Sequence, residues 1–169
     1  MIGTVPEGTR TDAQHAITAA NKVQRDWTAR SPFERAEIMK RAAVIGDERR
    51  DDLVRTLTLD QRKPLQMEAY DEVTELITYF RMAAADAARV EGAMPPSVDA
   101  RKRVLAYRVP RGVVGVITLW NWSYTMPAKA LAPALTCGNA VVWVSAPTTS
   151  ICTVKPSSTE SQTRSNSGK

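Results

Sequence analysis

Residues 112–144, GVVGVITLWNWSYTMPAKALAPALTCGNAVVWV, decide the fold of this chain. The run 113–118 is rich in β-branched residues, which is typical of a strand covered on both faces. A loop over 119–124 leads into a helix that we expect over 125–137. A second apolar run, 140–144, predicts another buried strand. Strand, helix and strand then form one right-handed βαβ unit with a parallel sheet.

This unit looks like the beginning of a larger sheet, because two parallel strands are too few to be covered on both faces. Upstream, residues 104–109 alternate between apolar and polar, which predicts a half-buried or edge strand. Its apolar side carries Leu105, Tyr107 and Val109. The predicted fold class is therefore α/β: an N-terminal helical layer followed by the start of a Rossmann-like parallel sheet, which is incomplete.

The first half of the chain is expected to be helical, because its apolar residues recur at intervals of three and four. The pattern predicts helices over 11–30, from Ser31 to a break at Gly46, over 47–59 and over 69–92. The residues expected on their buried faces include Ala13, Ala16, Ile17, Ala20, Val23, Trp27, Phe33, Ala36, Met39, Ala42, Ala43, Leu53, Val54 and Leu57.

Ser31 and Glu34 are expected to form a capping box at the start of the second helix.

The chain divides into three parts. The helical segment spans 1–98, and the first strands with the βαβ unit span 99–154. The tail 155–169 has no apolar residue other than Pro and Gly. We expect it to be disordered, because it cannot bury enough surface to offset its ordering entropy.

Composition excludes several classes of site and location. The chain has 169 residues, of which 43% are apolar and 24% charged, as in globular domains. The single histidine, His15, excludes a multi-histidine metal site, and two cysteines cannot build a cysteine-rich zinc site, so we expect no metal. The start lacks the apolar core of a secretory signal, and no apolar run approaches the length that spans a membrane. We therefore expect a cytoplasmic protein that binds no membrane.

The net charge of +5 is concentrated in one short stretch and in the tail. Residues 99–111 carry five basic groups and one acidic group, whereas the segment 1–98 is slightly acidic. A nucleic-acid-binding domain more often shows a broad basic face with aromatic residues interleaved. A solvated strand edge protected by charge explains the cluster as well, so we expect no nucleic acid partner.

The loop 118–124, TLWNWSY, is the strongest candidate for a functional site. Ligands of open α/β sheets bind beyond the carboxyl ends of the strands, where this loop begins. There the Asn121 amide could donate a hydrogen bond to a developing oxyanion. On the pattern alone the ordinary interpretation is favoured, with Asn121 as a turn residue and both tryptophans in the core.

Residues 107–122 closely resemble the entry to the cofactor domain of the aldehyde dehydrogenase superfamily, and the similarity extends to Val142 and, more loosely, over 11–154. The resemblance implies NAD(P)-dependent oxidation of a small-molecule aldehyde to a carboxylic acid, with NAD or NADP as cofactor. It makes Asn121 the catalytic oxyanion donor. Full-length members are usually homo-oligomers, and the strand over 104–109 is a candidate part of that interface. The residues expected to line the cofactor cleft are Ile117, Thr118, Leu119 and Trp120.

Several positions depart from the family pattern. Leu119 and Ser123 replace prolines, which is expected to loosen the loop around Asn121. Val144 stands where the family has a lysine that binds the adenosine ribose, so the preference between NAD and NADP stays open. Arg62 replaces a glycine before Lys-Pro, which is expected to strain a turn.

Neither Cys137 nor Cys152 fits the family nucleophile, which lies, like the general-base glutamate, beyond the region of resemblance. We therefore expect a truncated aldehyde dehydrogenase that is inactive alone, whether the truncation is biological or a reading-frame artefact. The alternative is a non-catalytic fragment that docks on a full-length relative through its unfinished sheet edge.

Overall fold

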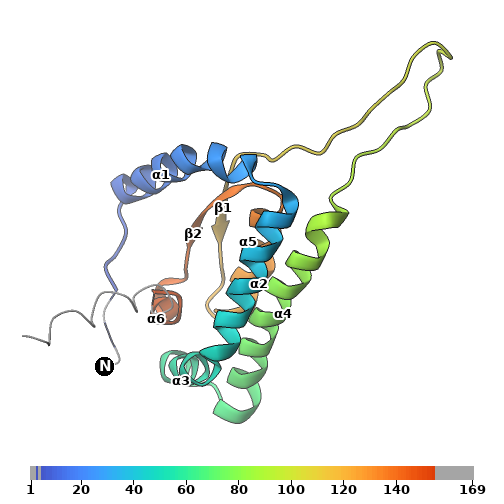
Figure 1. Cartoon of the computed structure of the whole chain (residues 1–169). Helices are drawn as coiled ribbons and strands as arrows, with labels where there is room; N and C mark the ends of the chain where they lie inside the picture. The colour runs from blue at the N-terminus through green and yellow to red at the C-terminus, as the bar shows by residue number, and fades with distance from the viewer. Residues whose placement is uncertain (1–2, 4, 155–169) are drawn as a thin grey trace, which may run out of the picture.

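The computed structural model describes residues 3 and 5–154, and the predicted tail 155–169 lies outside the described residues. A layer of helices covers a two-stranded sheet (Figure 1). Over the described part of the chain, no helix is long and apolar enough to cross a membrane. In chain order the elements are α1 (Arg10–Ala29), α2 (Pro32–Glu48), α3 (Arg50–Gln61), the π-helical turn η1 (Leu65–Ala69), α4 (Tyr70–Asp86), the 3₁₀ turn η2 (Ala87–Arg89), β1 (Val113–Ile117), α5 (Thr125–Thr136), β2 (Ala140–Val144), the 3₁₀ turn η3 (Pro147–Thr149) and α6 (Ser150–Val154).

Capping boxes begin the first two helices. The Ser31 hydroxyl accepts from the Glu34 N–H at 3.2 Å, and the Glu34 carboxylate accepts from the Ser31 N–H at 2.7 Å, as the sequence predicts. At α1 the box is formed by Thr9 and Asp12, so this helix starts slightly earlier than expected. Hydrogen bonds to Thr9 hold the pKa of the Asp12 carboxyl below its usual range.

The expected break at Gly46 is wrong, because α2 continues through it to Glu48. A β-carbon at Gly46 would stand 3.3 Å from Cγ1 of Ile77. The glycine therefore serves close packing between α2 and α4, which lie side by side in Figure 1. The third helix is shifted to Arg50–Gln61, and its predicted inward residues are buried as expected. Together these contacts form a core cluster of Ala43, Leu53, Val54, Leu57, Ala69, Val73, Ile77, Tyr124 and Cys152.

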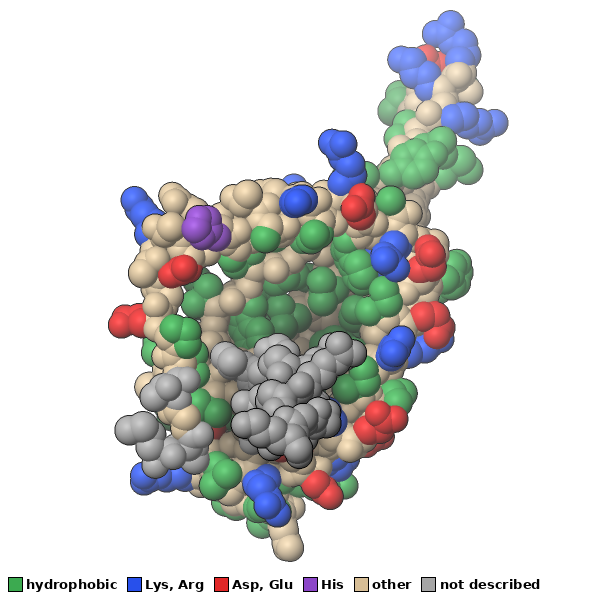
Figure 2. Space-filling model, turned by 60° about the vertical axis from the view of Figure 1, so that its left-hand side comes forward, with side chains coloured by type: hydrophobic (Ala, Val, Ile, Leu, Met, Phe, Trp, Pro, Cys, Tyr) green, Lys and Arg blue, Asp and Glu red, His purple; other side chains and the backbone are tan. Residues whose placement is uncertain are grey.

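The predicted burial of α1 is largely wrong. Of its apolar stripe only Ala20 is buried, while Ile17 and Val23 are exposed. Most of helix α1 lies against β2, and Trp27 near its end packs on the α2–α4 pair (Figure 1). Figure 2 shows a hollow beneath it with hydrophobic side chains on its wall. Phe33, which was also expected in the core, is exposed at the start of α2.

The predicted βαβ unit is confirmed. Strands β1 and β2 are parallel, with Val113 opposite Ala140 and Ile117 opposite Val144. Gly138 ends α5 at a φ of 87°, a backbone conformation that favours glycine. The expectation that both strands are covered on both faces is wrong, since Ile117 is 85% exposed. The physical reason is that each strand has one neighbouring strand in the described structure, and the contacts of α1 and α5 with the sheet leave the end of β1 uncovered.

Residues 104–109 do not form the predicted strand. The segment belongs to a long arm between η2 and β1 that projects from the body of the molecule (Figure 1). One antiparallel bridge joins Ala93 to Ala106, with N–H···O distances of 3.0 and 2.8 Å. The apolar side chains of Tyr107 and Val109 are exposed. An isolated hairpin without a covering layer is marginal, which explains why the alternating pattern yields a single bridge here.

Arg35 joins the α1–α2 turn to the carboxyl end of α5. Its buried guanidinium donates from Nε to the Thr136 carbonyl at 2.8 Å. From Nη1 it donates to the carbonyls of Thr28, at 3.4 Å, and Arg30. These carbonyls close the ends of two helices, where backbone acceptors lack helical partners and a cation is favourable.

We predict that Arg35→Met lowers the free energy of unfolding by about 2–4 kcal/mol, because the carbonyls at both helix ends lose their charged donor. Urea unfolding followed by circular dichroism measures the change. The exposed Arg41 on the same helix is the control, and Arg41→Met should change stability by less than about 0.5 kcal/mol. Equal effects of both substitutions would contradict a joining role for Arg35.

The strained turn expected at Arg62 is confirmed. Arg62 follows α3 with φ 57° and ψ 27°, and it is the one described non-glycine residue with a positive φ. Its N–H donates to the Thr58 carbonyl at 2.8 Å and so ends the helix. The left-handed conformation costs an L-residue about 1–2 kcal/mol.

Arg62→Gly relieves this strain but also increases the conformational freedom of the unfolded chain, which offsets part of the gain. The free energy of unfolding should therefore rise by about 1 kcal/mol. Arg62→Ala is the matched control, since it removes the guanidinium but keeps the β-carbon that causes the strain. Urea unfolding of the native chain and both variants measures the change in the free energy of unfolding. A similar increase in Arg62→Ala would show that the effect comes from loss of the charge and not from relief of strain.

Candidate active site

The loop 118–124 leaves the carboxyl end of β1 and turns back into α5. Its first residue stays tied to the sheet, because the Thr118 N–H donates to the Val144 carbonyl at 3.2 Å. The Thr118 hydroxyl accepts from the Trp143 indole N–H at 3.0 Å. Strand β2 therefore fixes the point from which the loop departs.

A buried carboxylate fixes the other end of the loop. Glu72, on the first turn of α4, is fully buried. Its Oε1 accepts from the Tyr124 N–H at 2.8 Å, and its Oε2 lies 2.5 Å from Nζ of Lys63. The Lys63 ammonium also lies 4.4 Å from the centre of the Trp122 ring, within the range of a cation–π interaction. One carboxylate thus connects α4, the turn before η1 and the start of α5.

Ser123 holds the middle of the loop. Its buried hydroxyl accepts a hydrogen bond from the Gln61 amide and donates to the Trp120 carbonyl at 3.2 Å. The sequence suggested that serine in place of proline would loosen this loop. The hydroxyl instead supplies two hydrogen bonds that proline could not make.

Asn121 lies exposed at the tip of this loop, and its side chain has no hydrogen-bond partner among residues 3 and 5–154. The reading of both tryptophans as core residues is wrong, since Trp120 is 63% exposed and Trp122 is also on the surface. The loop borders a cleft of about 600 Å³. The other described residues that line this cleft are Asp60, Gln61, Arg62, Lys63, Pro64, Glu68, Thr148 and Thr149.

The four residues expected to line the cofactor cleft continue along the same edge. Apolar surface is exposed by Ile117, Leu119 and Trp120. Thr118 is half-buried, and its hydroxyl is hydrogen-bonded to Trp143 of β2. Trp120 borders the Asn121 cleft directly, and the other three lie at the strand end beside it. The structure therefore brings the sequence-predicted site residues to one edge of the sheet.

Neither cysteine is among the described residues that line the Asn121 cleft. Cys152 is buried in α6, where its N–H and its thiol donate to Oδ2 of Asp60 at 3.0 and 2.8 Å. Burial, together with this hydrogen bond, raises the pKa of the Cys152 thiol above its usual range, which disfavours the nucleophilic thiolate. Cys137 is exposed but precedes β2, so it lies at the amino edge of the sheet. The five-residue strands place the two edges about 16 Å apart.

Glu72, Lys63 and Gln61 were missed by sequence reasoning. A usable signal existed for Glu72, an acidic residue inside the helical stripe formed by Ala69, Val73 and Leu76. Acidic residues are almost never fully buried unless they are paired, so this position calls for a partner. Nothing in the order of residues identifies Lys63 or the Tyr124 N–H as that partner.

Comparisons with known proteins agree with this arrangement. The sequence model of the aldehyde dehydrogenase family matches residues 1–158. The α-ketoglutaric semialdehyde dehydrogenase of Bacillus subtilis is 34% identical over 92% of this chain and 32% of its own length. The NADP-dependent succinate-semialdehyde dehydrogenase of Escherichia coli is 34% identical over 83% of this chain and 29% of its own length.

A crystal structure of an aldehyde dehydrogenase from Brucella melitensis has the same fold, with a TM-score of 0.88 and 32% identity over 90% of this chain and 32% of that one. The chain thus spans about a third of the length of the relatives that it matches. Because the family match covers all of the described residues, including the βαβ unit, we conclude that the chain belongs to the aldehyde dehydrogenase family.

Proposed function

We propose that this chain contributes the oxyanion-binding loop and part of the cofactor cleft to an NAD(P)-dependent oxidation of an aldehyde to a carboxylic acid. The observation that supports it is the exposed, unpartnered amide of Asn121 at the carboxyl end of β1. Glu72 and Ser123 hold the loop that carries it. A donor held in place before reaction stabilises a developing oxyanion without reorganisation in the transition state.

The edge beside Asn121 fits a dinucleotide in part. When bound, NAD(P) supplies the acceptor for the hydride that leaves the substrate. Ile117, Leu119 and Trp120 offer exposed apolar surface against which a flat ring can pack. Val144 is also exposed at the end of β2, and its side chain cannot donate a hydrogen bond to a ribose. The proposal therefore assigns ring contacts to this edge and does not choose between NAD and NADP.

The nucleophile of the proposed reaction comes from outside the described residues. Cys152 is held as a buried thiol by Asp60, and Cys137 lies at the opposite edge of the sheet. The Bacillus subtilis and Escherichia coli relatives are named as semialdehyde dehydrogenases, which supports a small aldehyde as the substrate class. We further propose that the chain alone does not turn over an aldehyde, and that the complete enzyme is a homo-oligomer.

The test joins residues 10–154 of this chain to the remainder of the Escherichia coli succinate-semialdehyde dehydrogenase in place of its matching segment. We predict that Asn121→Ala lowers kcat of this chimera about 10²- to 10³-fold, because one oxyanion donor is lost. KM should change little, since the donor acts mainly in the transition state. Steady-state formation of NADPH from succinate semialdehyde measures both constants.

Thr148→Ala, in the same cleft, is the matched control and should leave kcat within about twofold, because this exposed residue has no part in the proposed oxyanion binding. Replacing Cys137 and Cys152 by serine should also leave turnover intact. An unchanged kcat in Asn121→Ala would reject the oxyanion role. NADPH formation by the native chain alone would reject the proposed inactivity.

A second candidate function, docking on a full-length relative, is favoured by the two-stranded sheet with its exposed Val144. We predict that the chain co-sediments with a full-length aldehyde dehydrogenase and that Val141→Lys in β2 weakens this association, because a charge disfavours pairing at a sheet edge. Analytical ultracentrifugation measures it, with Val44→Lys on the exposed face of α2 as control. A monodisperse monomer that melts cooperatively and binds no relative would contradict docking.

A further inference from the structure

The loop that carries Asn121 has few backbone contacts of its own. No N–H of residues 119–123 donates a hydrogen bond to another described residue. The nearest N–H groups that do so on either side are those of Thr118 and Tyr124. Between these two points, the position of Asn121 is therefore set by contacts that side chains make.

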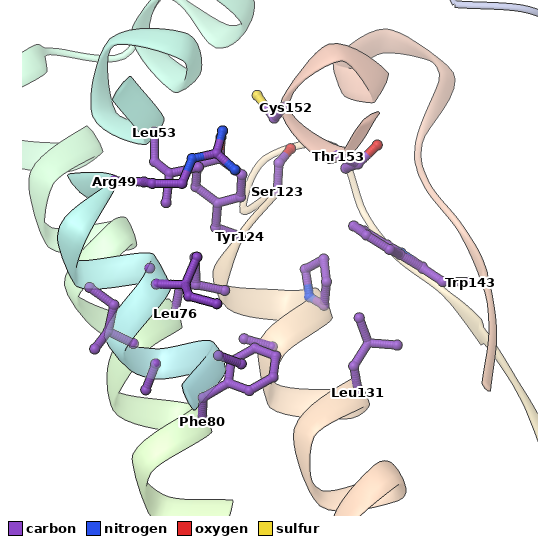
Figure 3. Close-up of a pocket in the computed structure, with 17 residues that line it drawn as sticks. Arg49, Leu53, Leu76, Phe80, Ser123, Tyr124, Leu131, Trp143, Cys152 and Thr153 are labelled. Carbon is purple, nitrogen blue, oxygen red and sulfur yellow. The ribbon is translucent and has the colours of Figure 1, made fainter. Parts of the chain in front are cut away.

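Two hydrogen bonds in series hold the peptide that precedes Asn121. The Gln61 amide, at the end of α3, donates to the buried Ser123 hydroxyl, and this hydroxyl donates to the Trp120 carbonyl at 3.2 Å. A serine hydroxyl has a single proton, so an amide that donates to its oxygen leaves that proton for the carbonyl. Figure 3 shows the Ser123 hydroxyl pointing away from α5 at the turn into that helix. Gln61 therefore fixes the carbonyl group that joins Trp120 to Asn121.

A cation holds the residue that follows Asn121. The Lys63 ammonium lies 4.4 Å from the centre of the Trp122 ring and 2.5 Å from Oε2 of Glu72. The Lys63 side chain is 12% exposed and that of Glu72 is fully buried, and a cation–π contact is stronger where the cation is removed from water. The buried carboxylate keeps the ammonium in place, and the ammonium in turn limits the positions that Trp122 can take.

Both contacts come from the same strained turn. Arg62, which lies between Gln61 and Lys63, has the left-handed backbone described above, with a φ of 57°. The residues on either side of it contact neighbouring parts of the loop, Ser123 and Trp122. Strained backbone persists where the surrounding structure determines it, and it is concentrated at functional sites. The two contacts give a reason for this strain to be kept in the folded chain.

We propose that Gln61 and Lys63 are positioning residues for Asn121, an inference that rests on the oxyanion role proposed above. Gln61 acts through Ser123 on the peptide before Asn121. Lys63 acts through Trp122 on the residue after it. Together they keep the Asn121 amide in one place before reaction, the condition under which a donor stabilises a developing charge without reorganisation. A displacement of about 1 Å at a reacting group can cost about 10²-fold in rate.

The first test measures the order of the loop in the native chain, without turnover. Gln61→Met keeps the length of the side chain and removes the amide donor. We expect the ¹⁵N order parameter of the Asn121 backbone amide to fall from the value of rigid backbone, about 0.85, to below about 0.6. Gln66→Met, at an exposed glutamine on η1 whose side chain makes no hydrogen bond within the described structure, is the matched control and should change nothing. An unchanged order parameter in Gln61→Met would overturn the proposal.

The second test uses the chimera described above and asks whether Gln61 acts through Asn121. Gln61→Met should lower kcat about tenfold with little change in KM, because a displaced donor is felt mainly in the transition state. In the Asn121→Ala background the same substitution should lower kcat less than about twofold, since no amide is left to position. Equal fold-losses in the two backgrounds would overturn the proposal. An unchanged kcat in Asn121→Ala would instead reject the oxyanion role, and the order parameters would still report on positioning.

The part played by Lys63 needs a double substitution, because Lys63→Met alone would leave the buried Glu72 carboxylate without its cation. Combined with Glu72→Gln, which keeps an acceptor for the Tyr124 N–H, it should lower kcat of the chimera about fivefold, the size of one cation–π contact. Circular dichroism and thermal melting first establish that the double variant is folded. Native kcat and native order at Asn121 in the folded variant would make Lys63 a counter-ion only and overturn its part in the proposal. If the double variant does not fold, Gln61→Met decides.

Discussion

The fully buried carboxylate of Glu72 is the contact on which the candidate site depends. It accepts from the Tyr124 N–H and faces the Lys63 ammonium, so it joins α4, the turn after α3 and the start of α5. A buried charge is tolerated only when it is paired and hydrogen-bonded, and removal of one partner typically costs about 3–5 kcal/mol. This cost restricts the three elements to arrangements in which the loop that carries Asn121 returns to α4 at Tyr124.

Arg35 has the corresponding role at the far end of α5. Its guanidinium donates hydrogen bonds to carbonyls at the end of α1 and at Thr136. The first helices therefore cannot shift without leaving backbone acceptors unpaired. Helix α5 is thus held at its start by a carboxylate and at its end by a cation. Both charges are also favourable to the helix dipole, which is positive at the start and negative at the end.

Local signals predicted most of the elements, because their causes lie within a few residues of one another. The capping box at Ser31, the inward face of α3 and the strand Ala140–Val144 agree with the structure. Predictions failed where burial depends on a distant neighbour. Gly46 did not end α2, because Ile77 of α4 packs against it, and the stripe of α1 stayed exposed where the helix stands apart from the α2–α4 pair.

The sequence by itself determined the βαβ unit and the position of Asn121 after a strand, because each depends on residues close in the chain. Its resemblance to the family also indicated the family and a strained turn at Arg62. Only the tertiary structure decided that Glu72 meets Lys63 and Tyr124, that Cys152 is held by Asp60, and that residues 104–109 form an exposed arm. These outcomes depend on contacts between distant segments. Short-range patterns carry no information on which buried groups will pair. The partners are selected in the folded structure, because a buried polar group without a hydrogen-bond partner costs more free energy than a paired one.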